Sequence, residues 1–152
     1  MNRVYTGAAA LVFALALNGP AVAENAMEDI AKYRHSVMES MAGHMGALAL
    51  IVQGKVDRGE FTQSHADAIA SATAELKSLF PEGSADQDGH ALPAIWENPD
   101  DFKAAVDKAR KTGAALSEAA ADGDRKAVMG AFAAMGKSCK GCHENYREEH
   151  DH

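Results

Sequence analysis

Two cysteines and a histidine lie within five residues near the end of the chain, in the order Cys139-Lys140-Gly141-Cys142-His143. On a helix, two thiols three residues apart point to the same side, so each can form a thioether with one vinyl group of a haem. His143 lies on that side as well and can offer an imidazole nitrogen to the iron as proximal ligand. The spacing is the attachment signature of a c-type haem, and we expect one covalently bound haem c.

Three other chemistries of paired cysteines fit this pattern less well. A zinc site needs four ligands, and none of the other histidines forms a second ligand pair at short spacing with the motif. A thioredoxin-like dithiol stands at the start of a helix that follows a strand, whereas these cysteines come well inside the last predicted helix. A disulfide between residues three apart in a helix has poor geometry.

Apolar residues at three- and four-residue steps predict two helices in the first half of the chain. The first covers residues 27–53, and Gly54 is placed to end it. The second carries the pattern over residues 66–79. Residues 81–97 begin with a proline, have no helical period and are predicted to form the one long loop. We expect Trp96 and the two residues before it to attach this loop to the core.

The second half of the chain predicts two more helices. Residues 98–101 (Asn-Pro-Asp-Asp) combine a capping amide, a proline suited to the first helical position and two acids that face the positive end of the helix dipole. This helix runs to about residue 121 and is broken at Gly123. Asp124 caps the fourth helix, whose apolar residues form a heptad seam along one face: Val128, Phe132, Met135, Cys139, Cys142 and Tyr146.

The pattern of helices predicts the fold class. No run of alternating β-branched residues bounded by turns occurs, so no strand is predicted. Four amphipathic helices with mostly short links predict an all-α protein, an antiparallel up-down-up-down four-helix bundle that binds one haem c. With 152 residues, the chain is too short for two domains of ordinary size.

The first 23 residues have the features of a secretory signal peptide. A positive end at Arg3 precedes an apolar run over residues 8–17, and residues 21–23 (Ala-Val-Ala) suit a signal peptidase. An uncleaved membrane anchor is the less favoured alternative, because the run is short and the helix-disrupting Gly19-Pro20 lies between it and the cleavage site. We expect a single mature domain over residues 24–152, located in the periplasm of a bacterial cell and without a further membrane span.

The charge balance narrows the choice of partners. Lys and Arg number 15 against 22 Asp and Glu, which gives a formal net charge of −7. Cleavage would remove Arg3 and no acid, and so would make the chain one unit more negative. This balance disfavours nucleic-acid binding and favours weak, electrostatically steered contacts with periplasmic redox proteins.

In the order of its motifs the sequence resembles the cytochromes c', or class II c-type cytochromes. The resemblance rests on residues 32–38 (Lys-Tyr-Arg-His-Ser-Val-Met), 79–81 (Leu-Phe-Pro), 93–96 (Pro-Ala-Ile-Trp) and 138–147. It covers essentially the whole mature chain, and a haem motif near the C-terminus separates this class from the commoner small cytochromes c. It implies a four-helix bundle with one haem that carries electrons or binds a small gas.

Antiparallel packing places the early part of the first helix beside the haem motif. His143 is about six residues from the end of its helix, level with about residue 33, and Met38 is about 8 Å further along at about 1.5 Å per residue. Met38 can therefore face the iron opposite His143, as the expected sixth ligand. We expect Met41 and Met45 to fill the core.

Two arginines are candidate partners for the haem propionates. Arg34 lies one turn before Met38 on the same helix face, and Arg147 lies one turn after His143. A solvated charge at the edge of the bundle is the alternative for each. The other histidines share no spacing that suggests a metal site, and we expect surface or loop positions for His35, His44, His65 and His90. Residues 148–152 are expected to form a frayed, charged end rather than a metal chelate.

Two functions of different class fit these features. In the first, the protein is an electron carrier whose low-spin iron is ligated by His143 and Met38. In the second, Met38 packs over the iron without bonding, and the open face binds a small gas such as nitric oxide. We favour the carrier because a thioether stands where many gas-binding relatives place an aliphatic residue, although some five-coordinate relatives also carry Met here. An enzyme is less favoured, since His143 has no acid–base partner in the expected pocket. The alanine-rich outer face of the first helix permits a homodimer or a monomer.

Overall fold

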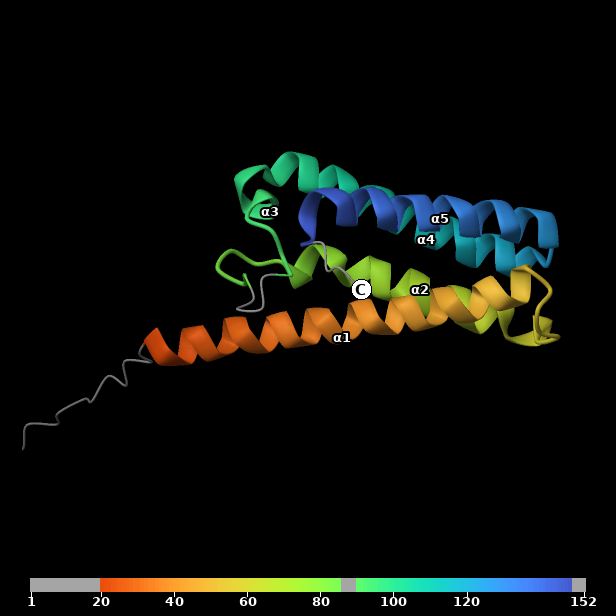
Figure 1. Ribbon diagram of the computed structural model, residues 1–152, viewed down its shortest axis with the longest axis horizontal. Helices are drawn as coiled ribbons and strands as arrows, with labels where there is room; N and C mark the ends of the chain where they lie inside the picture. The colour runs from red at the N-terminus through yellow and green to blue at the C-terminus, as the bar shows by residue number, and fades with distance from the viewer. Residues whose placement is uncertain (1–19, 86–89, 149–152) are drawn as a thin grey trace, which may run out of the picture.

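The structure is a computed structural model that describes residues 20–85 and 90–148 (Figure 1). Most of the expected signal peptide and the last four residues of the charged tail lie outside this part. Within it the chain forms no strand, and one isolated antiparallel bridge joins Ala91 to Arg147. No helix among the described residues combines the length and hydropathy needed to cross a membrane.

Four long helices build the protein: α1 (Pro20–Val52), α2 (Thr62–Glu75), α4 (Pro99–Asp122) and α5 (Arg125–Tyr146). Successive long helices run in opposite directions, so that the start of α1 and the end of α5 lie at the same end of the molecule (Figure 1). α1 packs on α2, α2 on α4 and α4 on α5, whereas α1 and α5 touch least among these neighbours. The expected antiparallel four-helix bundle is confirmed.

The helix ends follow local chemistry at three of the predicted positions. Gly54 and Gly123 adopt φ angles of 69° and 71°, in the left-handed region that glycine enters without a steric penalty. The carboxylate of Asp124 accepts hydrogen bonds from the backbone N–H groups of Lys126 and Ala127 at 2.8 and 3.4 Å. These residues end α1, separate α4 from α5 and cap α5 as expected.

The expected side-chain cap of α4 is absent. Asn98 stands at the N-cap position before Pro99, but its side chain makes no capping hydrogen bond. Asn98 also ends the one-turn helix α3 (Ala94–Glu97), where its backbone N–H bonds to the carbonyl oxygen of Ala94 at 3.0 Å. Its φ of −126° and ψ of 64° come from that turn and differ from the extended conformation that suits an N-cap.

Two helices begin earlier than their apolar patterns predict. α2 starts at Thr62, directly after the short 3₁₀ turn η1 (Gly59–Phe61), and a second 3₁₀ turn, η2 (Leu76–Leu79), follows it. The first turn of α2 is polar, so its apolar period begins only at the buried Ala66. α1 begins at Pro20, a residue tolerated at the first helical position.

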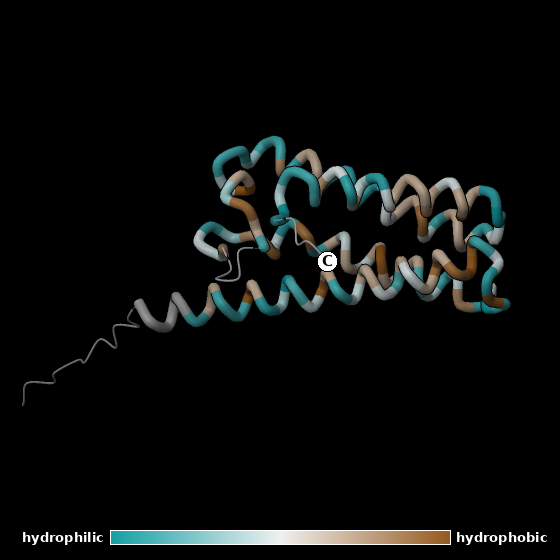
Figure 2. The backbone as a smooth tube through the Cα atoms, in the orientation of Figure 1, coloured by the Kyte–Doolittle hydropathy of each residue, from teal (hydrophilic) through white to brown (hydrophobic). Residues whose placement is uncertain are grey.

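The core consists of two groups of buried side chains, one toward each end of the bundle. Polar and apolar residues alternate along every long helix (Figure 2), as an amphipathic bundle requires. The near cluster, at the end of the haem motif, comprises Val37, Leu76, Leu79, Ile95, Phe102, Val106 and Ala109. The far cluster comprises Leu48, Val52, Ala66, Ile69, Leu116, Val128 and Met135.

The long loop is attached to the near end of the bundle, as predicted. Ile95 of α3 is only 3% exposed, and the indole N–H of Trp96 donates to the carbonyl oxygen of Pro81 at 3.1 Å. The N–H of Leu92 donates to the carbonyl oxygen of Tyr146 at 3.1 Å. The loop thereby joins the end of α5 to the near cluster.

α2 and α4 approach closely at Gly113. A Cβ atom added there would overlap the side chain of Thr73, which is fully buried and bonded to the carbonyl oxygen of Ala70. We expect Gly113→Ala to lower the free energy of unfolding of the holoprotein, because overpacking costs about 1–3 kcal/mol and exceeds the gain of under about 1 kcal/mol in helix propensity. Thermal unfolding followed by circular dichroism measures the change.

Gly130→Ala is the matched control for this substitution. Gly130 lies in α5 with nothing within 4 Å of the added Cβ atom. Here the helix propensity acts alone, and the stability should rise by about 0.5–1 kcal/mol. Equal stabilisation by both substitutions would contradict the close approach of α2 and α4.

Candidate haem site

The haem motif occupies the last turns of α5. Cys139, Cys142 and His143 are half-buried, and the two cysteines are not joined in a disulfide. Cys139 packs against the far cluster and Cys142 against the near cluster. Both sulfur atoms therefore lie on the face of α5 that packs on the core. Two thioether bonds to one macrocycle require this placement on a common face.

The surroundings of the motif hold its groups in their neutral forms. Burial raises the pKa of Cys139, and burial together with the neighbouring Cys139 raises the pKa of Cys142 to about 11. Thiols of this kind remain protonated at neutral pH, unlike the activated dithiol of a redox enzyme. Burial, and then the positive charge of Arg147, lowers the pKa of His143 and so favours the neutral imidazole that binds a metal.

Met38 lies on the part of α1 that meets the end of α5. Its side chain is half-buried and packs on the near cluster, as do those of Cys142 and Tyr146. The middle of α1 and the last turns of α5 are therefore level, in agreement with the register expected from an antiparallel bundle. Met41 also packs on the near cluster and Met45 on the far cluster, which confirms their expected role in the core.

Three observations fit a flat macrocycle between α1 and α5. The two helices have few contacts with each other, so a group bound between them would disrupt little existing helix–helix packing. The thiols and the imidazole supply the donor set of a c-type haem. The hydroxyl oxygen of Ser138, next to Cys139, is buried without a hydrogen-bond partner among the described residues, a condition that a bound group or water can relieve.

Arg34 is buried rather than solvated. It is 4% exposed, and its guanidinium donates to the carbonyl oxygen of Leu79 at 3.0 Å and to the hydroxyl and carbonyl oxygens of Ser84 at 3.1 and 2.8 Å. It also lies over the ring of Phe80, 4.9 Å from the centroid. The side chain therefore fixes the chain after α2 to α1, and its predicted contact with a haem propionate remains a prediction.

A row of aromatic rings continues from Arg34 to the haem motif. Phe80 and Phe102 meet edge to face with centroids 4.8 Å apart, and Phe102 meets Tyr146 in the same way at 5.1 Å. The row joins the end of η2 to α4 and α5, one turn beyond Cys142. Arg147 follows Tyr146, is exposed, and donates its backbone N–H to the carbonyl oxygen of His143 at 3.0 Å. A propionate contact of Arg147 likewise stays a prediction.

Two of the histidines do not lie where the sequence predicts. His44 of α1 and His65 of α2 are half-buried, with their Nδ1 atoms 2.9 Å apart. Their residue types carry no signal of this contact, because it depends on how α1 and α2 are rotated against each other. His35 is exposed and stacks on His90 of the loop at 5.8 Å between centroids, in agreement with the surface and loop positions expected for them.

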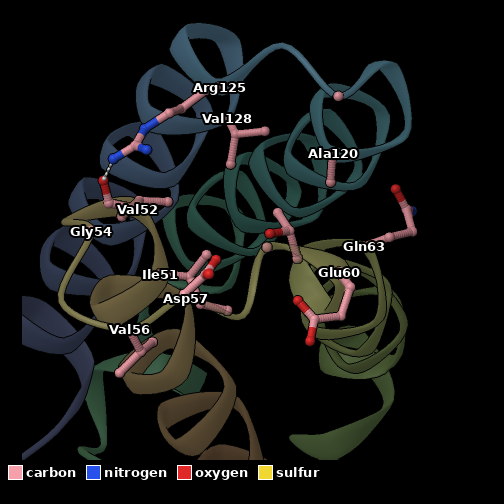
Figure 3. Close-up of a pocket in the computed structure, with 13 residues that line it drawn as sticks. Ile51, Val52, Gly54, Val56, Asp57, Glu60, Gln63, Ala120, Arg125 and Val128 are labelled. Carbon is pink, nitrogen blue, oxygen red and sulfur yellow. Dashed lines mark hydrogen bonds between the residues drawn. The ribbon is translucent and has the colours of Figure 1, made fainter.

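A separate pocket opens at the far end of the bundle (Figure 3). It has a volume of about 450 Å³ and is formed by the end of α1, the start of α2 and the turn between α4 and α5. Arg125 crosses one side, and its guanidinium donates to the carbonyl oxygen of Val52 at 3.2 Å (Figure 3). None of the predicted haem-site residues lines it, so this pocket is distinct from the haem site.

A haem-attachment motif near the end of the last helix of an antiparallel four-helix bundle defines a class II c-type cytochrome. The sequence matches the family profile described as Cytochrome C' over residues 29–147. It is 38% identical over 122 residues to the cytochrome c' of Pararhodospirillum photometricum, and the alignment covers 80% of this chain and 98% of that protein. It is 37% identical over 149 residues to the cytochrome c-554 of a Cereibacter sphaeroides strain, with 93% and 96% covered.

Solved structures agree with the sequence comparison. The cytochrome c' of Rubrivivax gelatinosus superposes with a TM-score of 0.75 at 29% identity, covering 80% of this chain and 97% of that one. The cytochrome c' of Thermochromatium tepidum gives a TM-score of 0.75 at 26% identity, with 81% and 97% covered. This chain belongs to the cytochrome c' family and binds one covalently attached haem c.

If haem is attached at Cys139 and Cys142 and the signal peptide is cleaved after Ala23, the mature protein should have a single defined mass. Denaturing mass analysis of periplasmic material should show a single haem added to a chain that begins at Glu24. A soluble product without haem, isolated from a host that matures c-type cytochromes, would contradict attachment at this motif.

The fold should depend on the haem. Only 6% of the residues are aromatic, and the buried core is mostly aliphatic, so a large apolar macrocycle would add much of the buried apolar surface at this end of the bundle. The double variant Cys139→Ala/Cys142→Ala should keep its helices in far-ultraviolet circular dichroism but lose near-ultraviolet signals and cooperative melting. Melting as cooperative and as high as that of the parent would show that the bundle does not need its haem.

Arg34 should stabilise the bundle through its hydrogen bonds to Leu79 and Ser84. Arg34→Ala leaves buried oxygen atoms of Leu79 and Ser84 without this donor, and the free energy of unfolding of the holoprotein should fall by about 2–4 kcal/mol. Arg110→Ala, which removes an exposed arginine 3.4 Å from Asp107, should change stability by under about 0.5 kcal/mol. Equal small effects in denaturant unfolding would argue against this role of Arg34.

Proposed function

We propose that this protein is a periplasmic electron carrier in which His143 and Met38 hold the haem iron from opposite sides. The observation that carries the proposal is the position of Met38, a half-buried thioether of α1 that packs on the same cluster as Cys142 of α5. The haem supplies a one-electron redox couple. A thioether ligand raises the reduction potential, and a site with two protein ligands changes little on electron transfer.

The remaining features of the site suit transfer between proteins. Two thioether bonds to Cys139 and Cys142 keep the cofactor from being lost outside the cytoplasm, where the predicted signal peptide directs the chain. The acidic surface, with a formal net charge of −7, favours brief contacts with basic patches on redox partners. The outer face of α1 is compatible with a homodimer or a monomer. We assign no enzymatic role to the site.

Gas binding is the second candidate function. Among the structural neighbours is a nitric oxide complex of a leucine-to-alanine mutant of the cytochrome c' of Alcaligenes xylosoxidans, with a TM-score of 0.75 at 30% identity. In this alternative, Met38 packs beside the iron without bonding and leaves the face opposite His143 open to a small gas. The two functions therefore differ in whether the Met38 sulfur bonds to the iron.

Substitution of Met38 distinguishes the two functions. If Met38 ligates, the ferric parent should be low-spin in optical and electron paramagnetic resonance spectra. Met38→Ala should then give a largely high-spin iron, a lower reduction potential and faster binding of carbon monoxide to the ferrous form, because the sixth position opens.

Two control variants isolate the effect of this thioether. Met45→Ala removes a thioether that packs on the far cluster, and His35→Ala changes an exposed residue of α1. Neither should alter the spin state or the rate of carbon monoxide binding. A parent that is already high-spin at neutral pH and unchanged by Met38→Ala would replace the carrier function with gas binding.

A further inference from the structure

His44 and His65 bring two imidazole rings into contact across the interface of α1 and α2. The Nδ1 atoms are 2.9 Å apart, and the ring centroids are 5.2 Å apart with the planes tilted by 55°. The residues are 21 positions apart in the sequence, so only the packing of the two helices brings them together. We propose that this pair binds a transition metal ion of the Cu²⁺ or Ni²⁺ class, at a site separate from the haem.

The distance between the two nitrogen atoms suits coordination by one ion. Imidazole nitrogen atoms bind such metals at about 2.0–2.1 Å, and two of them 2.9 Å apart then subtend an angle of about 90° at the ion. This is the angle between neighbouring ligands in square-planar and octahedral complexes, which Cu²⁺ and Ni²⁺ prefer. Mg²⁺ and Ca²⁺ require oxygen ligands and do not fit.

The chemistry of the contact also favours a cation. Only one of two facing Nδ1 atoms can carry the proton of a hydrogen bond between neutral imidazoles, and the other must present its lone pair. When both rings carry their proton on Nε2, each Nδ1 presents a lone pair, and a metal ion beside the line that joins the two atoms can accept both. The formal net charge of −7 adds a favourable field for a cation near the surface.

The pair lies apart from the haem motif along the bundle. His44 stands between Met41, which packs on the near cluster, and Met45, which packs on the far cluster. Nowhere in residues 20–85 and 90–148 do three or more His, Cys, Asp or Glu side chains gather in a metal-binding group, so the site supplies two protein ligands. Its other coordination positions are left to solvent, and the ion should exchange readily.

The test uses the haem-containing protein with His150→Gln and His152→Gln, because these tail histidines could also bind a metal. Titration calorimetry with NiCl₂ at pH 7.5 should show one equivalent bound. Adding His44→Gln or His65→Gln should weaken this binding at least tenfold, whereas His35→Gln should leave it unchanged. Haem absorption and far-ultraviolet circular dichroism establish that each variant is folded.

A second measurement does not depend on the folding of the variants. With one equivalent of CuCl₂, electron spin-echo modulation of the tail-substituted protein should register two equatorial imidazoles. One imidazole or none would overturn the proposal. Absence of stoichiometric Ni²⁺ binding, or Ni²⁺ binding that persists in both His44→Gln and His65→Gln, would overturn it as well.

Discussion

The structure depends on one constraint, the antiparallel register that brings the middle of α1 level with the last turns of α5. Three reversals of the chain, fixed in part by the left-handed Gly54 and Gly123, place these two segments at the same end of the bundle. A residue more than 100 positions away from the haem motif thereby comes to pack on the same cluster as Cys142. Without this register Met38 would not lie level with the haem motif.

Arg34 maintains the near end of the bundle where α1 and α5 have few contacts of their own. Burying a guanidinium is unfavourable unless its donors are satisfied, and here the carbonyl group of Leu79 and both oxygen atoms of Ser84 accept them. The arginine thereby fixes the chain beyond η2, and Phe80 links it to Phe102 and Tyr146. Polar bonds and ring contacts thereby connect α1, the end of η2, α4 and α5 at the haem end.

The features that the sequence predicts correctly are those set by neighbouring residues. The haem motif, the capping carboxylate of Asp124 and the glycine at position 123 act within a few residues of themselves, and their patterns are legible in the chain. The helix period likewise determines which residues face the core. The antiparallel arrangement then follows from the short links.

What the sequence does not predict depends on contacts between distant segments. The burial of Arg34 requires Ser84, which lies in a loop without a helical period. The contact of His44 with His65 requires a particular rotation of α1 against α2. The apolar pattern shows which face of each helix is buried, but it does not determine the exact rotation angle. The failed cap at Asn98 has the same origin, because the preceding turn α3 sets the backbone angles of that residue.

The choice between an electron carrier and a gas-binding protein is a competition for one flexible side chain. Methionine has three rotatable bonds and a polarizable sulfur atom, so Met38 can pack on the near cluster or turn its sulfur toward the iron. Fully burying a side chain of this size gains about 1.5–3 kcal/mol, and Met38 would lose part of this free energy on leaving the cluster. The free energy of the bond between sulfur and iron must exceed that loss. If Met38 ligates as proposed, the near cluster on which it packs would therefore influence the ligation without touching the iron. A better-packed cluster would hold the thioether aside and leave the sixth position open, whereas a looser one would release the sulfur atom to bind.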